Sequence, residues 1–256
     1  MSQMWRSWRR FSIFFLASLL VGLVFHAWSE GQAEPLTATP ETQLLSSPSQ
    51  NQLVQQGIER YQAGKFTDAI ALWQQALPKT TAAKDKAVIY TNLALAYRQT
   101  GQLASAIAFW EQAIQIYRAQ NEEMRQPLAG LLIEQAQAYS DLGQQRVAIP
   151  LLQSVIEMAR QNQASLTEAA AQGALGNAHW ALGDYEQALK AQKNSLKIAQ
   201  ELNNANYIAT ALNDLGNVYV SRGARYSYQA KLADLEGDDK EAARLNQIVE
   251  QDKAKA

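Results

Sequence analysis

The chain has 256 residues, 47% of them apolar, and a formal net charge of −1. A charge so close to zero leaves no basic stripe to neutralise phosphates, which argues against a nucleic-acid partner. The chain has no cysteine, which excludes disulfides, thiolate metal ligands and cysteine nucleophiles. Alanine, glutamine, leucine, glutamate and lysine dominate, and these helix-forming residues favour an all-α fold.

Residues 1–33 have the layout of a secretory signal. Arginines in the first ten residues precede an uncharged apolar run over 11–25, and small residues follow up to Ala33. The run is shorter than the roughly 20 residues needed to span a bilayer, so we expect cleavage after Ala33. An uncleaved membrane tether through residues 11–28 is the alternative. Under either reading we expect an exported chain, in a periplasmic, lumenal or extracellular compartment.

The rest of the chain divides by composition into three parts. Residues 34–52 hold three prolines among serines and threonines, which predicts a flexible linker. Residues 53–223 have the periodic pattern of a repeat array. Residues 224–256 are more charged, and two readings stay open for them: a helical cap that closes the array, or an interruption of a fifth repeat.

Five glycines set the period of the array. Gly64, Gly101, Gly143, Gly183 and Gly223 are 37, 42, 40 and 40 residues apart, and an alanine follows each of the first four by five residues. A fixed period of this length indicates a repeat protein, and each glycine is expected to end a helix and reverse the chain. The expected helix pairs are 53–63 with 66–77, 83–100 with 102–120, 126–142 with 145–162 and 168–182 with 185–202, followed by a single helix over 206–222.

The units share a small residue in the first helix, the turn glycine, an alanine in the second helix and a large residue four positions later. In the second unit these are Ala94, Gly101, Ala106 and Trp110. Such units resemble tetratricopeptide repeats (TPR), which implies a right-handed α-solenoid of antiparallel helix pairs. In the third unit Pro150 falls early in the second helix, so we expect that helix to start a residue or two late.

Two finer resemblances concern the whole arrangement. The period near 40 residues and the phrases LGN and GNAHW look like the longer-helix repeats of the Pins/LGN polarity adaptors. A leader, a spacer and such repeats together are similar to the N-terminal part of exported cyanobacterial TPR proteins that continue into a caspase-like CHAT domain.

The residues offer little to catalysis. Only two histidines occur, His26 in the leader and His179, which stands where the family places a packing aromatic residue. No phosphate-binding glycine loop occurs, and no residue set suggests a metal or a cofactor. We therefore predict a protein that is not an enzyme and that uses neither a metal nor a cofactor.

The resemblance implies that the first helix of each pair lines a concave groove. A carboxamide has donors and an acceptor and can clasp the backbone of an extended peptide, while an indole ring offers an apolar platform. The competing interpretation is that the asparagines cap or solvate helices and that Trp180 fills a gap between repeats. Trp73 and Trp110 are expected in the core. The predicted groove residues are Asn92, Arg98, Gln137, Asn177, Trp180, Asn213 and Asn217.

The predicted function is that of a non-catalytic scaffold that binds a protein or an extended peptide in this groove. Two alternatives stay open. The chain is a regulatory or recognition portion of a larger CHAT-type protein, or it is a structural spacer of the cell envelope.

Overall fold

The computed structural model describes residues 48–119 and 127–256, and residues 50–256 form one compact unit. Within these ranges every regular element is a helix, which confirms the predicted all-α class. None of the helices described is both long enough and apolar enough to cross a bilayer. The predicted signal, its cleavage site and the tether through 11–28 lie outside the described residues, as does most of the predicted linker.

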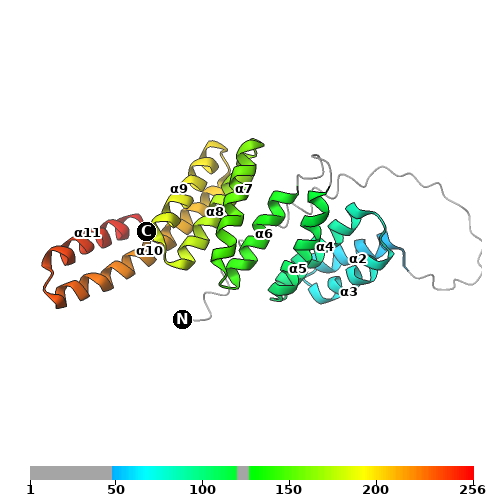
Figure 1. Ribbon diagram of the computed structural model, residues 1–256, viewed down its shortest axis with the longest axis horizontal. Coiled ribbons are helices and arrows are strands. Elements are labelled where there is room, and N and C mark those ends of the chain that lie inside the picture. Colours follow the sequence, from blue (N-terminus) through cyan, green and yellow to red (C-terminus); the bar gives the residue numbers. More distant parts are fainter. Residues whose placement is uncertain (1–47, 120–126) are drawn as a thin grey trace, which may run out of the picture. The chain divides into compact units, whose positions relative to one another are not determined.

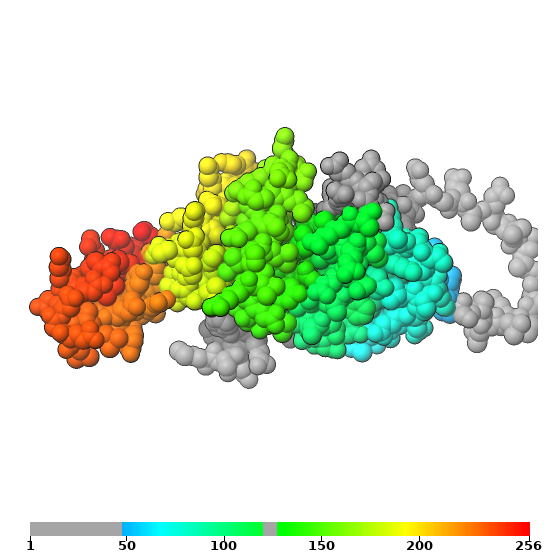
Figure 2. All heavy atoms as spheres, in the orientation of Figure 1, coloured from blue at the N-terminus to red at the C-terminus, as the bar shows by residue number. Residues whose placement is uncertain are grey.

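The helices form consecutive antiparallel pairs, and each helix packs against its neighbours in the chain, as in the predicted solenoid (Figure 1). We call the leading member of each pair its first helix. The neighbouring helices meet without a gap in the space-filling view (Figure 2). The pairs are α2 (Gln50–Gln62) with α3 (Phe66–Ala76), α4 (Ala83–Gln99) with α5 (Leu103–Arg118), α6 (Leu128–Asp141) with α7 (Gln145–Gln161), α8 (Ser165–Leu182) with α9 (Tyr185–Glu201), and α10 (Ala205–Glu236) with α11 (Asp239–Lys255).

Four of the five periodic glycines end a helix as predicted. Gly64, Gly101, Gly143 and Gly183 have φ values of 74°, 79°, 77° and 76°, in the left-handed region that only glycine enters without a steric cost. At the last of them, the N–H of Gly183 donates to the Trp180 carbonyl at 2.9 Å. Hydrogen bonds of this kind satisfy the carbonyls at the end of a helix and let the chain reverse.

Gly223 does not end a helix, and that part of the prediction is wrong. Helix α10 continues through Gly223 for another 13 residues to Glu236, and the chain reverses at Gly237, whose φ is 79°. No proline follows Gly223, and Gly223 is buried against α11 instead of lying at an open turn. The Oδ1 atom of Asp238 accepts from the Glu241 N–H at 3.0 Å and caps α11.

Pro150 does not delay the third pair's second helix either. Helix α7 begins at Gln145 and includes Pro150. Proline has no N–H to donate to the carbonyl of Arg146, so one bond of the first turns is missing. The helix tolerates this loss, since the residues that precede Pro150 already bond to Gln144, at 2.9 Å from Val147 and 3.2 Å from Ala148.

Tryptophans of the second helices fill the core, as predicted. Trp73 and Trp110 are 2% and 0% exposed. The Trp73 ring lies so close to α2 that a Cβ atom at Gly57 would be 2.3 Å from its Nε1 atom, and Nε1 donates to the Val54 carbonyl at 3.2 Å. The small residue of the first helix therefore leaves the space that the large side chain of the second helix fills.

Candidate functional site

All seven predicted groove residues lie on first helices. Side-chain contacts gather most of them into two groups. The arginine cluster consists of Arg98, Glu134, Gln137 and Asp141, on α4 and α6. The amide cluster consists of Asn177, Gln192, Asn213 and Asp214, on α8, α9 and α10. Side chains at predicted positions therefore contact the neighbouring first helix, Arg98 on α4 contacting α6 and Asn177 on α8 contacting α10.

The arginine cluster is internally satisfied. The Arg98 guanidinium forms an ion pair with Glu134, and its Nη2 atom donates to Gln137 Oε1 at 3.0 Å. Nη2 also lies 3.9 Å from a carboxylate oxygen of Asp141. The Arg98 and Glu134 side chains are 9% and 7% exposed. Arg98 and Gln137 thus hold α4 against α6. A ligand could bind these two side chains only by displacing the bonds between them.

The amide cluster surrounds one carboxylate. Asp214 Oδ2 accepts from Asn177 Nδ2 at 3.2 Å and from Gln192 Nε2 at 3.4 Å, while Asp214 Oδ1 accepts from Asn213 Nδ2 at 3.4 Å. Asn177 and Asn213 are exposed, whereas Asp214 is partly buried. Burial raises the pKa of Asp214 above its ordinary value, and the amide hydrogen bonds only partly oppose that shift.

Gln192 is the residue that the sequence analysis missed. It stands four positions after the repeat alanine, where other units have Trp73, Trp110 and Leu152, and it is 0% exposed. Its Nε2 atom also donates to Asn177 Oδ1 at 2.8 Å and to the backbone carbonyl of residue 173 at 3.1 Å. The signal was present in the register itself, because a polar amide replaces a large apolar residue at a core position.

The three remaining predicted residues, Trp180, Asn217 and Asn92, differ in whether their side chains form hydrogen bonds within the described chain. Trp180 is partly buried between α8 and α10, and its Nε1 atom donates to Ser221 Oγ at 2.9 Å. The indole N–H of Trp180 is thus engaged within the chain. Asn217 is exposed and Asn92 is partly buried, and neither side chain forms a hydrogen bond with another described residue. Both amides are therefore available to a ligand.

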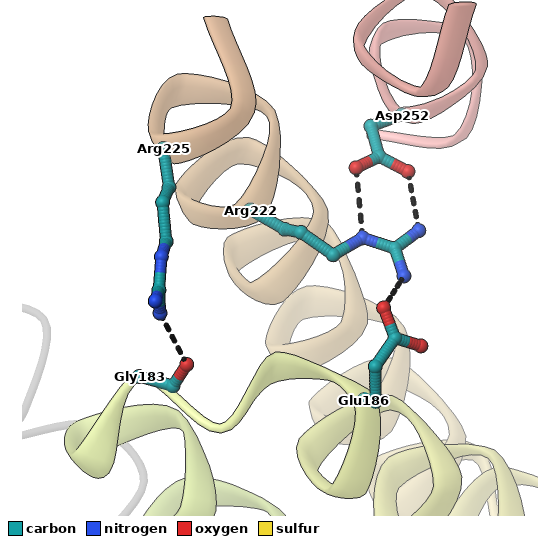
Figure 3. A network of polar contacts seen from close by, with 5 residues as sticks. All are labelled: Gly183, Glu186, Arg222, Arg225 and Asp252. Carbon is teal, nitrogen blue, oxygen red and sulfur yellow. Dashed lines mark hydrogen bonds and ion pairs between the residues drawn. The ribbon is translucent and has the colours of Figure 1, made fainter. Parts of the chain in front are cut away.

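A second polar network ties the last helix pair to the fourth repeat (Figure 3). Arg222 of α10 donates to both oxygens of Asp252 of α11, at 2.9 Å and 2.6 Å, and to Glu186 of α9 at 2.5 Å. The bonds to Asp252 raise the pKa of Arg222. Arg225 donates to the carbonyl of Gly183 at 2.9 Å. The network fixes where α10 and α11 stand against α9.

A depression of about 470 Å³ lies between α5, α6 and α7. Tyr139 and Glu111 face it, with Tyr139 Oη 3.2 Å from a Glu111 carboxylate oxygen, and Val147 forms an apolar part of its wall. Burial and the neighbouring Glu111 raise the pKa of Tyr139. No group of three or more histidine, aspartate or glutamate side chains in the described ranges could hold a metal ion.

Stacked antiparallel helix pairs with left-handed glycine turns define a helical repeat protein. The chain belongs to the tetratricopeptide-repeat family, whose sequence model matches residues 55–119, 85–161 and 167–227. Repeats of this family are generally non-catalytic, and the fold is consistent with a protein-interaction scaffold. The finer resemblances to Pins/LGN-type repeats and to CHAT-type proteins stay predictions.

Solved structures show the same fold. BtubC (BKLC) from P. vanneervenii has a TM-score of 0.58 at 20% identity over 80% of this chain and 79% of its own. A Rap protein complexed with competence and sporulation factor has a TM-score of 0.55 at 22% identity over 81% and 57% of the two chains. The repeats of a putative kinesin light chain from Podosopora anserina have a TM-score of 0.55 at 21% identity, over 80% of this chain and 94% of their own. A search of curated proteins found no significant match.

Proposed function

We propose that the protein is a non-catalytic scaffold that binds a protein or an extended peptide along the face formed by its first helices. The observation that carries this proposal is that side chains at predicted groove positions contact the neighbouring first helix. Arg98 meets Gln137 across α4 and α6, and Asn177 meets Asp214 across α8 and α10. These contacts join α4 to α6 and α8 to α10, and in the proposal the ligand lies along the side of the array that these helices form.

The exposed amides of α10 supply the binding chemistry. Asn213 and Asn217 are both exposed, and Asn217 has no other described residue as a side-chain hydrogen-bond partner. A carboxamide pairs with the N–H and C=O groups of an extended backbone whatever the sequence of that backbone. The Rap protein of similar fold, which was solved in complex with competence and sporulation factor, supports the proposal by analogy.

The test is an affinity capture from cell extract with the full chain. The groove variant Asn213→Ala with Asn217→Ala is compared with the control Gln112→Ala with Gln153→Ala, which removes two exposed amides from second helices. Asn177 is left intact because its loss would strip Gln192 of a partner. We expect the control to retain the proteins captured by the wild type and the groove variant to lose them. Equal recovery by all three would refute a site on the first helices.

We further propose that the chain acts outside the cytoplasm, released by cleavage after Ala33 or held by residues 11–28. The support is the sequence of the leader, with its early arginines and its uncharged run. Sequencing the N-terminus of the mature protein distinguishes the two states. A first residue of Glu34 is expected after cleavage, and a chain that still begins at Met1 would refute it.

A further inference from the structure

We propose that the amide cluster receives a basic side chain, lysine or arginine, of the bound segment, with Asp214 as its counter-charge. The inference rests on the proposed function, because it names a chemical feature of the segment that lies on the first helices. It assigns the cluster a selectivity that backbone recognition by asparagines does not provide.

The first argument is the missing counter-charge at Asp214. Among the described residues, its oxygens accept hydrogen bonds only from the neutral amides of Asn177, Gln192 and Asn213, at 3.2–3.4 Å. No lysine, arginine or histidine within the described ranges forms an ion pair with it. A partly buried carboxylate without a cation is disfavoured in its charged form, which is why burial raises its pKa. A cation from a ligand would relieve that cost.

The second argument is a shortage of hydrogen-bond donors. The Nε2 atom of Gln192 carries two hydrogens, yet three acceptors lie within 3.4 Å of it: oxygens of Asn177 and Asp214 and the carbonyl of residue 173. The Oε1 atom of Gln192 is buried and accepts no hydrogen bond from the part of the chain that the structure describes. Around Gln192 the acceptors therefore outnumber the hydrogens that Nε2 can donate. An ammonium group brings three donors and a guanidinium five, and neither brings an acceptor.

The third argument is the contrast with two other buried charged groups of the array. Arg98 is neutralised by Glu134, and the buried Asp252 is neutralised by Arg222. Those charges are paired within the chain. Asp214 has no such partner among residues 48–119 and 127–256, and the exposed amides of Asn177 and Asn213 beside it leave the cluster reachable from solvent.

The experiment selects peptides from an immobilised random dodecapeptide library with the full chain. Three proteins are compared: the wild type, Asp214→Asn and Asp234→Asn. The last removes an exposed carboxylate from the same helix and serves as the matched control. We expect wild type and control to enrich lysine or arginine at one peptide position and Asp214→Asn to lose that enrichment.

Titration of one selected peptide completes the test. Replacing its basic residue by glutamine should weaken binding to the wild type about tenfold, the loss of one charge-assisted contact, and should leave binding to Asp214→Asn unchanged. The peptide substitution is measured on the wild type and so does not depend on how the variant folds. Selection of peptides without a basic residue, or equal enrichment by Asp214→Asn, would overturn the inference alone. Failure to select any peptide would count against the proposed function as well.

Discussion

The carboxylate of Asp252, 1% exposed on α11, is held by both an Nε and an Nη2 bond from Arg222 of α10 (Figure 3). The planar guanidinium matches the two carboxylate oxygens, so the pair fixes orientation as well as distance. Glu186 of α9 receives the third bond from the same guanidinium. One arginine thus joins three helices at the end of the array.

Replacing Arg222 by methionine should destabilise the protein by about 3–5 kcal/mol, because it leaves a buried carboxylate without its cation. The double variant Arg222→Met with Asp252→Leu should recover most of that loss. Urea unfolding followed by circular dichroism measures both. The control is Arg225→Met, which removes an exposed bond to the Gly183 carbonyl. If Arg222→Met and Arg225→Met lower the free energy of unfolding equally, the buried pair does not hold α10 against α11.

Two glycine-to-alanine variants should have opposite effects. Gly223→Ala should stabilise the protein by about 0.5–1 kcal/mol, since alanine is the better helix former. Its Cβ would meet Asp252 Cβ at 3.6 Å, an ordinary contact. Gly183→Ala should destabilise it by about 1–2 kcal/mol because of the left-handed backbone there. Thermal unfolding shows whether each variant is more or less stable than the wild type. Destabilisation by Gly223→Ala would support a turn at Gly223, as the repeat period predicted, and not a continuous helix.

Gly57→Ala should cost about 1–3 kcal/mol, because the added methyl overlaps the Trp73 ring. If the overlap is the cause, the double variant Gly57→Ala with Trp73→Leu should cost less than the sum of the two single changes. A double-mutant cycle by chemical denaturation measures the coupling. Additive costs would mean that the two positions do not share one space.

The repeat register could be predicted from the sequence because it depends on local rules. A glycine in the left-handed region, a small residue and a bulky one each leave a mark at fixed spacing. The length of α10 could not be predicted from the period, because a helix continues past a glycine when packing on both sides favours it. The signal for the true turn was Gly237 followed by Asp238 and Glu241, the pattern of a capped helix start.

The candidate site was predictable in part. The first-helix positions follow from the register, so Asn177 and Asn213 were identified from the sequence. Which of the amides are already engaged depends on contacts between repeats, which no local pattern records. Gln192 reaches Asn177 and Asp214 across three helices, and only the structure shows that these side chains meet.

The stability of the protein should depend on pH through Asp214. Its pKa is raised from the ordinary 3.8 in the folded state, with burial as the main cause. The proton therefore binds more tightly to the folded chain, and its contribution to stability is complete below the unfolded pKa and is lost as pH rises through the folded one. The free energy of unfolding of the wild type relative to Asp214→Asn should fall as the pH rises from below the ordinary pKa of 3.8 through the raised pKa of the folded state. A relative stability that rises over this range would contradict the shift.

Site-specific photo-crosslinking tests the binding face most directly. A benzophenone amino acid replaces Asn217 on the first-helix face of α10, or Gln153 on the second helix α7, and each variant is irradiated with a protein captured by the wild type. A crosslinked product is expected from position 217 and none from position 153. Crosslinking from position 153 alone would place the partner on the second helices and contradict binding along the first helices.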